Sequence, residues 1–87
     1  MSAAARLAEL GLTLPAVATP VAAYVPAVKT GNYVYTSGQL PFVEGKLQGT
    51  GKLGDSVTVE EGATLARICA LNALAAAADE ELPVADR

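Results

Sequence analysis

The sequence predicts a small α+β domain made of a short N-terminal helix, a β-hairpin, a Gly-rich loop and one long helix. Apolar residues recur at helical spacing near the amino terminus and, over a longer stretch, in the second half. Between them, two runs rich in Tyr, Val and Thr flank a Gly-Asn pair. At 87 residues the chain has room for one domain. We divide it into 1–21 (helix and connector), 22–54 (hairpin and loop), 55–80 (helix) and 81–87 (tail).

The first element is a short helix from Ser2 to Leu10. Ser2 is a favoured N-cap residue, and Leu7 and Leu10 share one side of the helix. Gly11 follows where a helix commonly takes a left-handed cap, and Pro15 prevents the helical pattern from continuing.

The second element is a hairpin, with strands at Tyr24–Lys29 and Tyr33–Ser37 around a turn at residues 30–32. Pro26 cannot donate to a strand ladder, so the first strand is expected at a sheet edge or with a bulge. The alternation puts Tyr33 on the same face as Tyr35. We expect both faces of this strand to be at least half-buried.

The residues from Gly38 to Gly54 cannot hold a helix, because glycines and Pro41 interrupt them. We expect a loop or a loosely paired strand. The glycines have neither the Walker A spacing nor the dinucleotide-binding spacing, so they do not predict a phosphate site.

The third element is a long helix that starts after Thr58, since Thr58 and Glu61 have the spacing of a capping box. We interpret Glu60 and Glu61 as helix-stabilising residues of the first turn. Large apolar residues mark one face and alanines the others, so most of the helix needs cover and one hairpin cannot supply it. The acidic stretch Asp79–Pro83 is expected beyond the last turn, because carboxylates there oppose the helix dipole.

Composition excludes several functional classes. The net charge is −3 and the six cations are scattered, so no nucleic-acid partner is expected. The chain has no His, which excludes His-dependent nucleophiles and His-containing metal sites within it, and no metal is expected. Cys69, in mid-helix, is expected to be a structural thiol. No leader and no apolar run of about 20 residues is visible, so we expect a cytoplasmic protein with no membrane partner.

Several motifs in order resemble the Rid family (YjgF, reactive-intermediate deaminases), and cover nearly the whole chain. They are Tyr24–Pro26, Gly31–Asn32, Tyr35–Pro41, Glu60–Gly62 and Ala66–Ala75. The likeness is greatest to a poorly characterised branch with an N-terminal helix and a Cys-Ala-Leu-Asn helix.

The resemblance implies the N-terminal half of a chorismate-mutase-like fold, in which a mixed sheet carries two helices on one face. Full members continue with a strand, a second helix and closing strands, so this chain is expected to be truncated and inactive alone. They form homotrimers with ligand clefts between subunits, and the same is expected of the full-length parent.

The resemblance also implies an activity, the hydrolysis of reactive enamines or imines to keto acids and ammonia without metal or cofactor. Tyr24 matches a tyrosine that borders the family's cleft, and Ser37 and Gly38 match its pocket turn. The family's carboxylate-binding arginine and late glutamate belong to the second half, so the catalytic residues stay unassigned. Arg67 lies on the first long helix and is not that arginine.

The residues alone favour simpler roles. Ser37 and Gly38 are then a strand end and a turn, and Tyr24 is a packing aromatic. Asn72 is expected to satisfy neighbouring backbone groups rather than to contact a ligand. The alternative function is a non-catalytic member of the family that binds a small molecule or has a regulatory role. An endoribonuclease role is disfavoured by the acidic balance.

Overall fold

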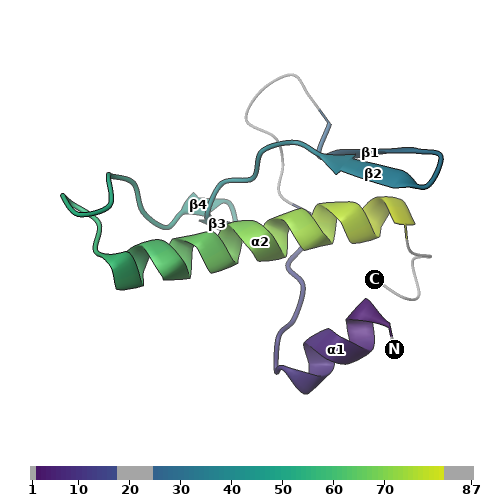
Figure 1. Cartoon of the computed structure of the whole chain (residues 1–87), viewed down its shortest axis with the longest axis horizontal. Helices are drawn as coiled ribbons and strands as arrows, with labels where there is room; N and C mark the ends of the chain where they lie inside the picture. The colour runs from purple at the N-terminus through teal and green to yellow at the C-terminus, as the bar shows by residue number, and fades with distance from the viewer. Residues whose placement is uncertain (1, 18–24, 82–87) are drawn as a thin grey trace.

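The computed structural model describes residues 2–17 and 25–81 and confirms the α+β class. Helix α1 (Ala3–Glu9) is followed by two antiparallel hairpins and helix α2 (Val59–Glu81). The strands are β1 (Ala27–Thr30), β2 (Tyr33–Thr36), β3 (Phe42–Val43) and β4 (Lys46–Leu47). Figure 1 shows α2 spanning the molecule, with both hairpins on one side of it and α1 on the other.

Helix α1 has the caps that its sequence predicts. The hydroxyl of Ser2 accepts a hydrogen bond from the backbone N–H of Ala5 at 3.0 Å. Gly11 takes a left-handed conformation with φ of +71° just after the helix. Arg6 and Glu9 form an ion pair at 3.0 Å, which contributes little because both side chains are exposed.

The β1–β2 hairpin has a two-residue turn, with Thr30 paired to Tyr33 across it. Gly31 has a φ of +58°, as the first central residue of a type II′ turn requires. Among the described residues this sheet has two strands, so β1 lies at an edge, as predicted from Pro26.

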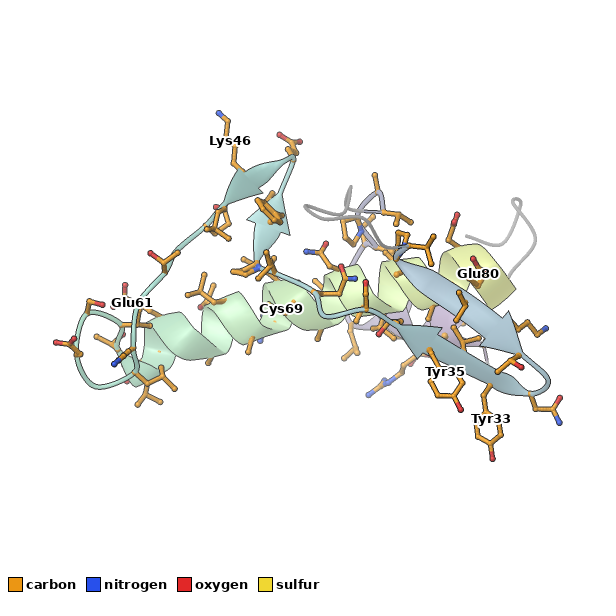
Figure 2. All side chains as sticks on the ribbon, turned by 90° about the horizontal axis from the view of Figure 1, so that it is seen from above. Tyr33, Tyr35, Lys46, Glu61, Cys69 and Glu80 are labelled. Atoms are coloured by element: carbon orange, nitrogen blue, oxygen red, sulfur yellow. The ribbon has the colours of Figure 1, made fainter. Side chains whose placement is uncertain are left out.

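The expectation that both faces of β2 are half-buried was wrong. Ala27 on the inner face is buried, but the outward-facing rings of Tyr33 and Tyr35 are 68% and 57% exposed. Their centroids lie 6.3 Å apart, and Figure 2 shows both projecting away from the ribbon. Helix α2 packs against one face of the hairpin, and among the described residues no element covers the other.

The Gly-rich stretch, expected to be a loop or a loosely paired strand, contains a short two-stranded hairpin. Phe42 pairs with Leu47, and the Glu44-Gly45 turn between the strands has positive φ at both residues. This is the geometry of a type I′ turn. A further bridge joins Leu53 to Val57 just before α2.

Helix α2 begins with the predicted capping box. The N–H of Thr58 donates to Glu61 Oε1, and the N–H of Glu61 donates to Thr58 Oγ1, both at 3.1 Å. The helix continues to Glu81, so the prediction that this stretch lies beyond its last turn was wrong for Asp79, Glu80 and Glu81, while residues 82 and 83 lie outside the described residues. The preceding alanines favour helix by more than the small cost of exposed carboxylates at a carboxyl end.

The buried core is small. Among the described residues the buried apolar side chains are Ala27, Val57, Ala75 and Ala76. The accessible surface is 6290 Å², against about 4,800 Å² for a compact monomer of this mass. The radius of gyration is 14.1 Å, against about 12 Å for a compact chain of this length. The chain therefore exposes more surface than a compact monomer of its mass does.

Candidate functional site

The candidate site is the turn at Ser37 and Gly38, where the chain leaves β2 and crosses toward β3. Figure 1 shows this connection running along α2 between the two hairpins. Tyr24, the third predicted ligand-binding residue, lies outside the described residues.

Ser37 ties the turn to the start of β1. Its backbone N–H and its hydroxyl both donate to the carbonyl oxygen of Pro26, at 2.9 and 3.2 Å. On its other side, Gln39 Nε2 donates to the carbonyl of Ser37 at 3.3 Å and to its Oγ at 3.4 Å. The hydroxyl proton of Ser37 is thus used in a hydrogen bond within the chain, and the side chain helps to fix the backbone of the turn.

Gly38 is exposed and stands over open space. A Cβ placed on Gly38 would meet no heavy atom within 4 Å, and its φ lies outside the left-handed region. Neither packing nor backbone conformation within the chain therefore requires glycine at this position. Hydrogen bonds therefore fix the turn at Ser37, whereas the space next to Gly38 is free of other atoms of the chain.

Asn72 anchors the segment that follows the turn. Its side chain is 2% exposed, and its Nδ2 donates to the carbonyls of Leu40 and Phe42 at 3.0 and 3.1 Å. The N–H of Phe42 also donates to Leu40 O at 2.8 Å, closing a tight turn around Pro41. The prediction that Asn72 satisfies backbone groups is confirmed. Its partners lie 30 and 32 residues away in the chain, which the sequence did not indicate.

Glu61 and Cys69, the other reactive side chains that the sequence analysis considered, do not lie at this turn. Figure 2 shows Glu61 at the far end of α2 from the tyrosines of the β1–β2 hairpin. Hydrogen bonds from Thr58 lower the pKa of Glu61, which fits its capping role. Cys69 is half-buried and forms no disulfide. Across residues 2–17 and 25–81, no cluster of three acidic, Cys or His side chains could hold a metal ion.

A hollow that the sequence did not predict lies between α1 and α2. It has a volume of about 730 Å³ and is lined by leucines and alanines of both helices and of the connector after α1. The charged residues in its lining are Arg6 and Arg67, and neither Ser37 nor Gly38 contributes to it.

No helix in the described part of the chain combines the length and apolar character needed to cross a bilayer.

Comparison with known proteins identifies the family. The family described as "YjgF/chorismate_mutase-like, putative endoribonuclease" matches residues 4–82. Protein TCP17 of Trypanosoma cruzi is 48% identical over 68 residues, which are 78% of this chain and 42% of that protein.

Two solved structures share the fold. A crystal structure of "a putative endoribonuclease" from Shewanella oneidensis MR-1 superposes with a TM-score of 0.78 at 41% identity, over 86% of this chain and 50% of that one. The protein Atu1372 "with unknown function" from Agrobacterium tumefaciens has a TM-score of 0.70 at 44% identity, over 86% and 45% of the two chains. This chain spans about half the length of these relatives. By motif order, family match and fold, the chain belongs to the YjgF/chorismate-mutase-like family.

Proposed function

We propose that the Ser37–Gly38 turn forms one wall of a pocket for a small imine or enamine that carries a carboxylate. In the whole protein to which these residues belong, this substrate is hydrolysed to a keto acid and ammonia. Tyr24 is proposed to border the same pocket. The homotrimer, with its pocket between subunits, is likewise a proposal for the whole protein.

The observation that carries the proposal is the open space over Gly38 within a firmly held backbone. Ser37 is fixed to Pro26 on one side, and Asn72 fixes Leu40 on the other. Backbone groups that are held in place before a ligand arrives can orient it without a cost of reorganisation. A residue without Cβ lets a ligand approach the main chain closely.

The chemistry is compatible with the residue types. An enamine first takes a proton on its β-carbon and loses one from nitrogen, which gives the imine. Water then adds to the carbon of the C=N bond, the nitrogen takes a proton, and the carbinolamine releases ammonia to leave the keto acid. These steps need a polarised C=N group, a positioned water and a proton path. The turn offers neutral groups from Ser37, Gly38 and Gln39, so it supplies binding and orientation. An acid–base group and a carboxylate-binding cation must come from elsewhere in the whole protein.

The same observation supports the alternative, a member that binds such a metabolite without converting it. No titratable side chain belongs to the turn, and the Ser37 hydroxyl donates to Pro26 rather than toward open space. An RNA-cleaving role, which the names of relatives suggest for those proteins, is disfavoured by the net charge of −3.

The test is keto-acid release from a freshly generated 2-imino acid, catalysed by the whole protein. We expect Gly38→Arg to abolish the activity, because the new side chain fills the proposed pocket. The melting temperature should be retained, because a Cβ at this exposed position meets no heavy atom of the chain within 4 Å. Thr50→Arg, in an exposed loop, is the matched control. An unchanged rate in a folded Gly38→Arg variant would remove Gly38 from the site. Ligand binding by a wild-type protein that releases no keto acid would support the alternative.

A further inference from the structure

We propose that Gln39 selects the substrate at the Ser37–Gly38 turn by accepting a hydrogen bond from the substrate's nitrogen. The N–H of an imine or the NH₂ of an enamine donates to Gln39 Oε1, whereas the carbonyl oxygen of a keto acid has no proton to donate. This proposal rests on the pocket of the proposed function and adds to it the group that recognises the substrate's nitrogen.

Hydrogen bonds to Ser37 fix which end of the Gln39 amide faces the turn. Nε2 lies 3.3 Å from the carbonyl oxygen of Ser37 and 3.4 Å from its Oγ. A carbonyl oxygen only accepts hydrogen bonds, so the end of the amide that faces it is the NH₂ group. The Ser37 hydroxyl agrees with this assignment, because its proton is donated to Pro26 O and its oxygen remains to accept. Oε1 is therefore the end of the amide that does not face Ser37.

The Oε1 atom of Gln39 has no partner and is accessible. Across residues 2–17 and 25–81, both hydrogen bonds of the Gln39 side chain are made by Nε2. The residue is half-buried, and in the same part of the chain no buried side-chain nitrogen or oxygen lacks a partner. An Oε1 atom without a partner must therefore reach the surface, where both of its lone pairs are open to a ligand.

Oε1 also lies close to the place proposed for the ligand. Nε2 is 3.3 Å from the carbonyl oxygen of the peptide group that joins Ser37 to Gly38. Since Nε2 and Oε1 are bonded to one carbon, standard amide dimensions put Oε1 within about 6 Å of that carbonyl oxygen. Gly38 is exposed, and a Cβ on it would meet no heavy atom beyond its chain neighbours within 4 Å. A small ligand that contacts Gly38 is therefore within reach of Oε1.

An acceptor at this place distinguishes the substrate from the product. Hydrolysis converts C=N into C=O, so a nitrogen that donates is replaced by an oxygen that only accepts. Oε1 attracts the N–H group and repels the lone pairs of the keto oxygen, and specificity commonly combines one attractive with one repulsive contact. The turn therefore favours the nitrogen-containing substrate over the keto acid, which assists product release.

Two stable probes of the same shape test the proposal with the whole protein. Pyrrole-2-carboxylate has an N–H next to the carbon that carries its carboxylate, and furan-2-carboxylate has an ether oxygen at the same position. We expect titration calorimetry to show that the wild type binds the pyrrole about tenfold more tightly, because one hydrogen bond is gained and one repulsion is avoided. Gln39→Met removes the acceptor at nearly constant size and should bind the two probes equally.

Gln48→Met is the matched control. Gln48 Nε2 donates to the carbonyl oxygen of Lys46 at 2.9 Å, two residues back as in Gln39, but Gln48 is exposed and follows β4. This variant should keep the tenfold preference. Gln39→Glu retains an acceptor, so it should bind both carboxylate probes more weakly and keep the preference between them. A merely structural role of Gln39 would not change this ratio, and melting temperatures verify that each variant is folded.

The outcomes separate this proposal from the proposed function. Equal affinity of the wild type for the two probes, or a preference that survives in Gln39→Met, would overturn the role of Gln39 and leave the pocket in place. A preference in a protein that releases no keto acid would support Gln39 and contradict the hydrolysis. A wild type that binds neither probe would overturn the pocket and the role of Gln39 together.

Discussion

The side-chain nitrogen of Asn72 lies 3.0 Å from the carbonyl oxygen of Leu40 and donates a hydrogen bond to it. The same nitrogen donates to Phe42 O at 3.1 Å, so both N–H groups of the amide are used. Asn72 is the one buried polar side chain among the described residues. It joins the middle of α2 to the segment that leaves the candidate turn, and thereby fixes where that turn lies on the helix.

Replacing Asn72 should therefore be costly. Asn72→Asp has the same shape but sets a carboxylate against two carbonyl oxygens, and we expect a loss of about 3 kcal/mol in the free energy of unfolding. Urea denaturation at neutral pH measures it. Asn32→Asp is the matched control, because Asn32 lies in the exposed hairpin turn and tolerates aspartate. Equal stability of the two variants would show that the Asn72 bonds do not hold the segment.

The hydroxyl of Ser37 should contribute less than its backbone. Ser37→Ala removes one of two hydrogen bonds to Pro26 O, together with the long bond that Oγ accepts from Gln39 Nε2 at 3.4 Å, and leaves the N–H bond at 2.9 Å intact. We expect a loss of about 1 kcal/mol in the free energy of unfolding. Ser56→Ala removes an exposed hydroxyl and should change stability by less than about 0.5 kcal/mol. A Ser37→Ala variant as stable as Ser56→Ala would mean that the backbone bond alone holds the turn.

Local features of the fold could be predicted because neighbouring residues determine them. Ser2 caps α1, the pair Thr58 and Glu61 caps α2, and Gly31 turns the first hairpin, each within a few residues of the element it shapes. Burial could not be predicted in this way. Tyr33 and Tyr35 alternate as a buried strand face does, but a face is buried only where another element covers it.

The candidate site was predictable only in part, because it also depends on contacts between distant segments of the chain. The motif at Ser37 and Gly38 identified the turn, but the residue that anchors the segment after it is Asn72, some 30 residues further along the chain. The α1–α2 groove was missed because alanines on every side of α2 leave its amphipathic face undefined.

The capping box predicts a pH dependence in acid. Hydrogen bonds from Thr58 hold the pKa of Glu61 below its ordinary value of 4.5 in the folded chain. A depressed carboxyl pKa stabilises the fold above the unfolded value, and this contribution is lost as the pH falls through the folded pKa. We expect Glu61→Gln to reduce the acid-side slope of stability against pH. The slope comes from urea midpoints measured between neutral and acidic pH. Glu44→Gln, whose carboxyl lies in an exposed turn, should keep the wild-type slope.

Two glycines with opposite surroundings give the last prediction. A Cβ on Gly51 would collide with the side chains of Ser56 and Val57, and the φ of Gly51 is +135°. Gly51→Ala should therefore lower the free energy of unfolding by about 1–3 kcal/mol. A Cβ on Gly38 meets nothing, so Gly38→Ala should be neutral or stabilise the chain by up to about 1 kcal/mol through the unfolded state.

Thermal and urea denaturation of the two alanine variants make this comparison. The Gly38 result also bears on the proposed pocket, because a position with no folding role leaves ligand approach as the reason for glycine there. If Gly38→Ala lost as much stability as Gly51→Ala, glycine would be needed for folding. The open space over Gly38 would then no longer support a ligand site.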